Sequence, residues 1–361
     1  MNYAYWLSNI PGIGIRSRNC LLAAAGTAEE VYRLTKRQLL AVRGIGERQA
    51  CQIAESKNRD YEKAFEALKK RGIGFISREE RKFPDRLREI PDAPYSLYFL
   101  GELPGQEDMQ KKLVAIVGAR RCSAYGHAVA EKLGRELAAA GAGVVSGMAQ
   151  GIDASGHRGA LQGGGRTFAV LGSGVDVCYP AFSRELYGEI AEHGGVISEY
   201  PPGTQPKPGL FPARNRIISG LSDVVVIVEA RARSGSLITA DYALEQGKDI
   251  YAVPGRLYDA LSEGCNRLIG QGAGMIFDVG EFLDELKICQ MKHDGTENFK
   301  KLLLEKDENL VYSCLSLRPK SLEQVLDETG MAVPDAADIL ARLIRKKYIA
   351  ETARNYYIRQ I

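Results

Sequence analysis

At 361 residues the chain is too long for one ordinary domain, and two or three domains are expected. No apolar run approaches the ~18 residues that span a bilayer, and the start lacks the pattern of a secretion signal, so a cytoplasmic protein without membrane contact is expected. Seven scattered cysteines without a CxxC pair favour reduced thiols over disulfides or a zinc site.

The net charge of +3 is unevenly distributed. Residues 1–75 carry 13 Lys and Arg against 7 Asp and Glu, whereas residues 76–299 carry 24 against 29. Overall charge therefore says little about nucleic acid, and a local basic cluster would have to bind it against an acidic background.

Residues 1–75 predict a helical domain whose short helices are separated by glycine hairpins. Segments 10–14 and 42–46 repeat an apolar-x-Gly-apolar-Gly signature, and the second copy looks like a helix-hairpin-helix. The first copy departs from that pattern at Arg18, where a small residue is usual. Such hairpins either bring backbone N–H groups to a DNA phosphate or merely pack, and both interpretations remain open. Residues 76–110 read as a connector, to which we assign no function.

From residue 111 to 286 the pattern changes to α/β. Apolar strands are expected at 113–117, 143–146, 168–171, 196–198, 224–228, 250–253 and 275–277, with helices at 127–140, 179–193 and 238–246 between them. Continuous Val and Ile strands that alternate with helices predict a mostly parallel sheet covered on both faces.

Glycine-rich loops follow several of these strands, at 118–126, 146–153, 172–176 and 234–239. Ligands of open α/β sheets bind outside the carboxyl ends of the strands, where these loops would meet. Their backbone amides and helix N-termini are typical of anion pockets.

A proline-stiffened loop at 199–212 leads into an expected helix. Proline lowers the entropy of the loop, so its side chains are held ready for a ligand. Those side chains are Lys207, Phe211, Arg214, Asn215 and Arg216. Stacking and a cationic track are typical of single-stranded nucleic acid binding. The alternative is that Phe211 belongs to the core and the arginines are solvated.

Residues 287–299 read as a linker and residues 300–361 as a winged helix. A capping box at Ser321 opens one helix, 334–346 predicts a second, and 348–352 and 355–359 would pair as the wing. Asp335 and Asp338 lead the second helix and would repel phosphates. This favours partner binding or packing over the reading of duplex DNA.

No catalytic motif is convincing. Segment 172–177 lacks the third glycine of GxGxxG, and neither a P-loop nor metal-ligand spacing is present. Asp153 and His157 could form an acid/base pair, but a helix cap with a structural hydrogen bond is the favoured interpretation. We therefore expect no cofactor and no metal.

Several motifs together resemble the DNA-processing protein A (DprA/Smf) family, in the family's order. They are VGAR at 117–120, SGMAQGID at 146–153 with His157, GSGVD at 172–176 with Tyr179 and Pro180, FPARNRIISGLS at 211–222, EARARSGSLITA at 229–240 and VPG at 253–255. The resemblance implies an extended Rossmann fold and a dimeric, non-catalytic protein. It would bind single-stranded DNA, protect incoming strands and help load a RecA-type recombinase in natural transformation.

The resemblance also implies a DNA site. Arg120 would hold a phosphate, the loop side chains would line the strand's track, and glycine-loop amides would complete the pocket. Ala119 stands where the family usually has serine, so that one hydroxyl is lost. The expected DNA-binding residues are Gly118, Arg120, Arg121, Ser146, Gly147, Gly151, Gly172, Ser173, Gly174, Lys207, Phe211, Arg214, Asn215 and Arg216.

Two other functions compete with this one. Phosphoribohydrolase-like proteins share the fold and its phosphate loops, so a nucleotide-processing enzyme with Glu229 or Glu199 as the carboxylate is the main alternative. A protein-binding adaptor is the third.

Overall fold

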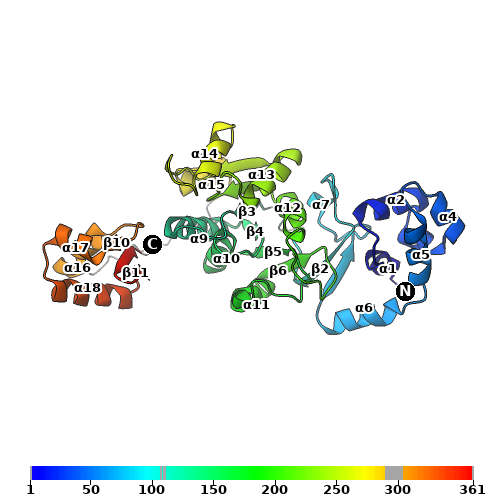
Figure 1. Cartoon of the computed structure of the whole chain (residues 1–361), viewed down its shortest axis with the longest axis horizontal. Helices are drawn as coiled ribbons and strands as arrows, with labels where there is room; N and C mark the ends of the chain where they lie inside the picture. Colours follow the sequence, from blue (N-terminus) through cyan, green and yellow to red (C-terminus); the bar gives the residue numbers. More distant parts are fainter. Residues whose placement is uncertain (1, 106–107, 109–110, 289–303, 360–361) are drawn as a thin grey trace.

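The computed structural model describes residues 2–105, 108, 111–288 and 304–359, and Figure 1 shows them as three units in chain order. The first unit is helical. Its helices are α1 (Tyr3–Ser8), α2 (Ile15–Ala25), α3 (Ala28–Arg33), α4 (Lys36–Ala41), α5 (Glu47–Ser56) and α6 (Tyr61–Lys70). Trp6 is fully buried at their centre, and its indole nitrogen donates a hydrogen bond to the Ser56 hydroxyl.

The helical unit packs directly on the sheet. Tyr95, Tyr98 and Val175, which belong to the sheet and its loops, are buried in the same apolar cluster as Trp6. Strands β1 (Gly74–Ser77) and β2 (Ser96–Gly101) pair with each other and extend one edge of the sheet, with the short helix α7 (Asp85–Arg88) between them. The expected connector is therefore structurally part of the sheet.

The central sheet has nine strands in the order β1-β2-β6-β5-β4-β3-β7-β8-β9. The remaining bounds are β3 (Leu113–Val117), β4 (Gly143–Ser146), β5 (Thr167–Leu171), β6 (Gly194–Ser198), β7 (Val224–Ile227), β8 (Asp249–Ala252) and β9 (Gly274–Met275). From β6 to β9 all neighbours are parallel, whereas β2 pairs antiparallel with β6. This confirms the predicted mixed α/β fold with a mostly parallel sheet.

Helices cover the sheet on both sides. They are α9 (Ala124–Ala139), α10 (Ile152–Gln162), η1 (Ala181–Ser183), α11 (Arg184–Glu192), α12 (Leu210–Leu221), α13 (Gly235–Glu245), α14 (Glu263–Gly270) and α15 (Val279–Glu285). One apolar core joins the sheet to α7, α12 and α13, and another joins it to α9, α10 and α15. Glycine lets α9 and α10 approach closely, because a Cβ at Gly159 would lie 2.1 Å from the Glu131 carbonyl oxygen.

Strand order reverses at β3. The chain runs from β3 outward through β4, β5 and β6, then returns to place β7 on the other side of β3. Such a switch point leaves a crevice at the carboxyl ends of the strands, because the loops on either side leave in opposite directions. The loops after β3, β4 and β7 all reach this crevice.

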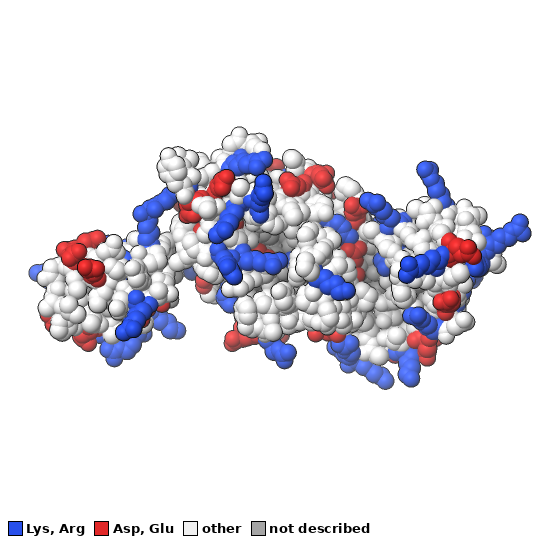
Figure 2. All heavy atoms as spheres, viewed as in Figure 1, with Lys and Arg blue, Asp and Glu red and all other residues white. Residues whose placement is uncertain are grey.

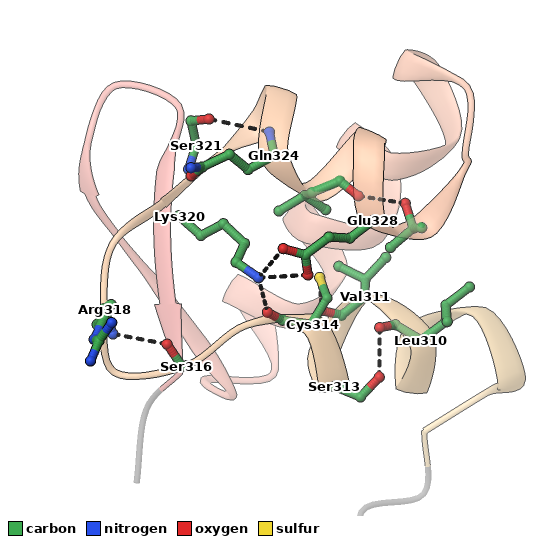
Figure 3. A network of polar contacts seen from close by, with 12 residues as sticks. Leu310, Val311, Ser313, Cys314, Ser316, Arg318, Lys320, Ser321, Gln324 and Glu328 are labelled. Atoms are coloured by element: carbon green, nitrogen blue, oxygen red, sulfur yellow. Dashed lines mark hydrogen bonds and ion pairs between the residues drawn. The ribbon is translucent and has the colours of Figure 1, made fainter.

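The last unit is a small helical bundle with a three-stranded sheet. Its elements are α16 (Lys306–Cys314), β10 (Lys320–Ser321), α17 (Leu322–Thr329), α18 (Val333–Arg345), β11 (Ile349–Ala353) and β12 (Tyr356–Arg359), with sheet order β10-β12-β11. The Lys320 ammonium contacts the Cys314 carbonyl oxygen and both oxygens of Glu328, and so ties β10 to α16 and α17 (Figure 3). Among the described residues, no helix has the length and apolarity needed to cross a membrane.

Candidate nucleic-acid interface

An open cavity of about 450 Å³ lies at the switch point of the sheet. Residues that follow β3 and β4 line one part of it, and the proline loop, α12 and the start of α13 line the rest. Of the predicted site residues, Gly118, Arg120, Phe211, Arg214 and Asn215 are in the lining. Figure 2 shows Lys and Arg side chains gathered over the middle of the molecule, where the central sheet lies.

A cation and two aromatic rings are stacked at this cavity. The guanidinium carbon of the exposed Arg120 lies 5.1 Å from the centroid of the Phe211 ring. On the same ring Tyr179 forms a second contact, with centroids 5.7 Å apart and planes tilted by 33°. Tyr179 is itself 45% exposed. Planar rings beside a free cation are suited to hold bases and phosphates of a single strand.

Phe211 lies in the first turn of α12, directly after the proline loop, and a glycine makes room for its ring. A Cβ at Gly172 would lie 2.9 Å from the Phe211 ring and 3.3 Å from the Leu210 backbone. Gly174 donates its N–H to the Thr204 carbonyl oxygen at 2.9 Å. The 172–174 segment therefore supports the proline loop, and its residues do not line the cavity. Lys207 is exposed between Pro206 and Pro208, which do line it.

Arg214 is buried and braces the loop after β4. Its Nη1 donates to the carbonyl oxygens of Gly147, at 2.7 Å, and Val170. Burial lowers the pKa of Arg214 to about 10, so the guanidinium stays charged at neutral pH. Its Nε is buried without a hydrogen-bond partner among the described residues. Arg214 thus reaches the cavity as a fixed charge within the loop scaffold.

Asp153 closes the same loop from the other side. Its carboxylate accepts the N–H groups of Gly147 at 3.1 Å and Ala149 at 3.3 Å. Burial raises the pKa of Asp153, although the Arg214 guanidinium acts in the opposite direction. His157 faces elsewhere, with its Nδ1 2.7 Å from the Thr167 hydroxyl oxygen. The structural part of the favoured interpretation agrees with these contacts, but the helix cap was wrong, because the N-cap of α10 is Gly151 and Asp153 binds N–H groups of the preceding loop.

Other predicted site residues lie outside the cavity. The guanidinium of Arg216 is buried and pairs with Glu199 at 2.7 Å. Ser146 donates its hydroxyl to the Ile116 carbonyl oxygen. Gly151 is the N-cap of α10 and has a φ of +85°; a Cβ there would lie 2.4 Å from the Ala119 carbonyl oxygen. The lining of the main cavity lacks Arg121, Ser146, Gly147, Gly151, Gly172, Ser173, Gly174, Lys207 and Arg216, although Gly147 lines an adjoining recess of about 110 Å³.

The two carboxylates considered for an enzyme are both engaged elsewhere. Glu229 is buried and accepts hydrogen bonds from the backbone N–H and hydroxyl of Ser123 at the start of α9. Glu199 is held in the ion pair with Arg216. Neither lines the cavity. Among the residues that the structure describes, no group of three or more His, Cys, Asp or Glu could hold a metal ion.

The structure adds residues that the predicted site lacked. Tyr179 contacts Phe211, while Ser234, Gly235 and Ser236 line the cavity at the start of α13. Asn215 is fixed there, since its Nδ2 donates to the Gly235 carbonyl oxygen at 3.2 Å. The sequence signals were present, in the glycine-flanked serines and in Tyr179 before a proline. Only the fold shows that these two segments, far apart in the chain, face one cavity.

The fold and the cavity define a class: an α/β protein with a mostly parallel sheet and a cavity lined by arginine and aromatic side chains at its switch point. The family model described as DNA recombination-mediator protein A matches residues 74–287, which includes the whole central sheet. The chain belongs to this family.

Similar proteins agree with this assignment. Protein Smf of Synechocystis is 32% identical over 375 residues, covering 94% of each chain. The X-ray structure of DNA processing protein A from Streptococcus pneumoniae matches with a TM-score of 0.69 and 35% identity, over 79% of this chain and 98% of that one. A structure that reports the single-stranded DNA binding mode of the Helicobacter pylori protein matches with a TM-score of 0.54 and 33% identity, over 60% and 95%.

Proposed function

We propose that this protein binds single-stranded DNA at the switch-point cavity and acts as a recombination mediator without catalysing a reaction. The stack of Arg120 on Phe211 in an open cavity carries the proposal, because it places an exposed cation and an aromatic ring together in one cavity. A phosphate would lie at Arg120 and a base on the ring. Lys207 would continue the cationic track along the loop.

The glycine-loop residues outside the cavity have a supporting role in this proposal. Gly172 and Gly174 position the proline loop, while Arg214 and Asp153 hold the loop after β4. The remaining contacts to the strand would come from the start of α13, where the Ser234 and Ser236 hydroxyls lie 2.8 Å apart in the cavity lining and the Ser234 hydroxyl also accepts the Ser236 N–H at 3.4 Å. Helix N-termini favour anions because their first N–H groups are unpaired.

A binding assay tests the proposal directly. A labelled oligonucleotide is titrated with the protein over a salt series, once as a single strand and once as a duplex. We expect a strong preference for the single strand and a steep loss of affinity with salt, because phosphate contacts release counterions. Equal binding of both would point to the end units as the DNA contacts. Absence of binding, with free base released from nucleoside monophosphates, would replace the proposal by the nucleotide enzyme.

The proposed partners are a second copy of the chain and a RecA-type recombinase. A dimer would sediment at twice the mass of the chain. A mediator should stimulate the DNA-dependent ATPase of RecA on a strand already covered by a single-strand binding protein, whereas RecA alone should lag. The proposed location of this activity is the cytoplasm.

We also propose that residues 1–75 form a helix-hairpin-helix-like unit and residues 300–361 a winged helix joined by the linker 287–299. Left-handed glycines at Gly12 and Gly44 turn the chain before α2 and α5, which supports the first assignment. The antiparallel pair of β11 and β12 beside α18 supports the second. Asp335 lies in the first turn of α18, so partner binding is proposed for this unit in place of duplex reading.

A further inference from the structure

The turn of the proline loop is held from outside by one short segment of chain. Within the loop, Thr204 donates its N–H and its hydroxyl to the Pro201 carbonyl oxygen, at 3.2 and 2.6 Å. The N–H of Gly174 and the carboxylate of Asp176 then fix this turn. Asp176 accepts the Gly203 N–H on its Oδ1 at 2.6 Å.

The second oxygen of Asp176 is bound by the helical unit. Arg71, which follows α6, donates from Nη2 to Asp176 Oδ2 at 2.5 Å. The Asp176 side chain is 17% exposed and the Arg71 side chain 54%. Between Gly174 and Asp176, Val175 is fully buried in the apolar core of the helical unit. One carboxylate therefore joins the first unit to the loop that bears Lys207 and leads into α12, where Phe211 lies.

This bridge is placed to affect loop order more than stability. An ion pair with a half-exposed partner contributes little to the free energy of unfolding. The hydrogen bond from the Gly203 N–H to Asp176 acts on the shape of the loop. Gly203 has a φ of +80° and lies in the turn that sets the direction of the following residues. A loop that is already ordered loses less entropy when it binds, so a looser loop should bind more weakly.

We propose that Arg71 is a positioning residue: through Asp176 it orders the proline loop for single-stranded DNA without touching the strand. The first unit thereby sets the affinity of a site on the second. This inference rests on the proposed function in its effect on binding, but the order of the loop can be measured without DNA.

The test compares Arg71→Gln and Asp176→Asn with Lys70→Gln, which removes a neighbouring charge outside the bridge. Hydrogen exchange of the DNA-free full chain should be faster over residues 203–210 in the two bridge variants and unchanged in the control. Single-strand affinity should fall about three- to tenfold in the bridge variants. The slope of affinity against salt and the melting temperature should stay near those of the wild type.

Several outcomes would overturn the inference. Unchanged exchange over residues 203–210 would show that the bridge does not order the loop, whatever the protein binds. A salt slope reduced by about one charge in Arg71→Gln would make Arg71 a phosphate contact. The double variant offers a further check: because Arg71 acts through Asp176, the two substitutions together should lose no more affinity than Asp176→Asn alone. The wild type could fail to bind DNA while hydrogen exchange over residues 203–210 is faster in the bridge variants. The proposed function would then be wrong, and the ordering of the loop by Arg71 and Asp176 would be confirmed.

Discussion

Arg120 combines exposure, charge and a fixed position over Phe211, which distinguishes it from the other arginines of the site. Arg214 and Arg216 are buried with protein partners, so their charges are already committed to the fold. At the scale of single residues, a phosphate is bound by a cation that is exposed to solvent, as Arg120 is. Burial therefore separates the exposed Arg120 from the buried Arg214 and Arg216.

We expect Arg120→Ala to weaken single-strand binding for all sequences alike and to reduce the salt slope by about one charge, since one phosphate contact is lost. The measurement is affinity over a salt series. Arg121→Ala is the matched control, because Arg121 is an adjacent exposed arginine outside the cavity lining. Equal effects of both variants would remove the special role of Arg120.

Phe211→Ala should lower the affinity by about 1–3 kcal/mol if the ring stacks on a base. Phe211→Tyr keeps the ring and should retain most of the affinity. The folded state of each variant is checked by circular dichroism. Wild-type affinity in a folded Phe211→Ala protein would assign the ring to packing alone.

His157 gives the fold a pH dependence. Burial and the Arg214 charge lower the pKa of His157 from 6.5 to about 3. Between these pH values the imidazole is therefore protonated in the unfolded chain and neutral in the folded chain. The contribution of His157 to the free energy of unfolding is complete above pH 6.5. It is lost as the pH falls toward 3, at up to about 1.4 kcal/mol per pH unit. Asp153 acts with the opposite sign at acid pH, because its pKa is raised.

Denaturant unfolding at a series of pH values below 6.5 measures this effect. In His157→Gln the free energy of unfolding should fall less steeply with decreasing pH than in the wild type. The difference in slope should correspond to about one proton. Parallel curves for the two proteins would mean that His157 is not the titrating group.

At the scale of elements, the 172–174 segment positions α12 and its ring. We expect Gly172→Ala to lower single-strand affinity although Gly172 does not line the cavity, because its Cβ would displace Phe211. Gly188→Ala on α11 is the control, since a Cβ there meets nothing within 4 Å. The control should bind normally and be slightly more stable, by about 0.5–1 kcal/mol. Normal binding by Gly172→Ala would show that the loop adapts.

At the scale of the whole molecule, the two end units are connected to the central sheet in different ways. The helical unit shares its core with the sheet, whereas the last unit has an apolar cluster of its own, formed by residues such as Val311, Val325 and Ile339. Removing the first unit should therefore expose buried residues of the sheet. Removing the last unit should leave the sheet's core intact.

A chain that ends at residue 288 should accordingly retain most of the single-strand affinity. The same salt series measures this, with the full chain as reference. A collapse of affinity in the folded short chain would make the last unit part of the DNA interface and would reverse its proposed role in partner binding.

The sequence by itself determined the parallel sheet, because its strands are continuous apolar runs buried on both faces, such as 113–117 and 224–227. It also determined which loops bear glycine and which segment bears Phe211. These features are local, and local patterns of hydrophobicity and backbone freedom are readable along a single chain. Ranges that fall on residues 289–303, in the predicted linker and at the start of the last unit, lie outside the described residues.

Only the tertiary structure decided which of these residues share a cavity. Arg214, Asn215 and Arg216 are consecutive in sequence, yet Arg214 and Asn215 line the cavity, with Arg214 also bracing a loop, whereas Arg216 pairs with Glu199 outside it. The direction of a side chain on a helix and the neighbours that bury it depend on segments far away in the chain. For the same reason Tyr179 joins Phe211, and Arg71 reaches Asp176 across 105 residues.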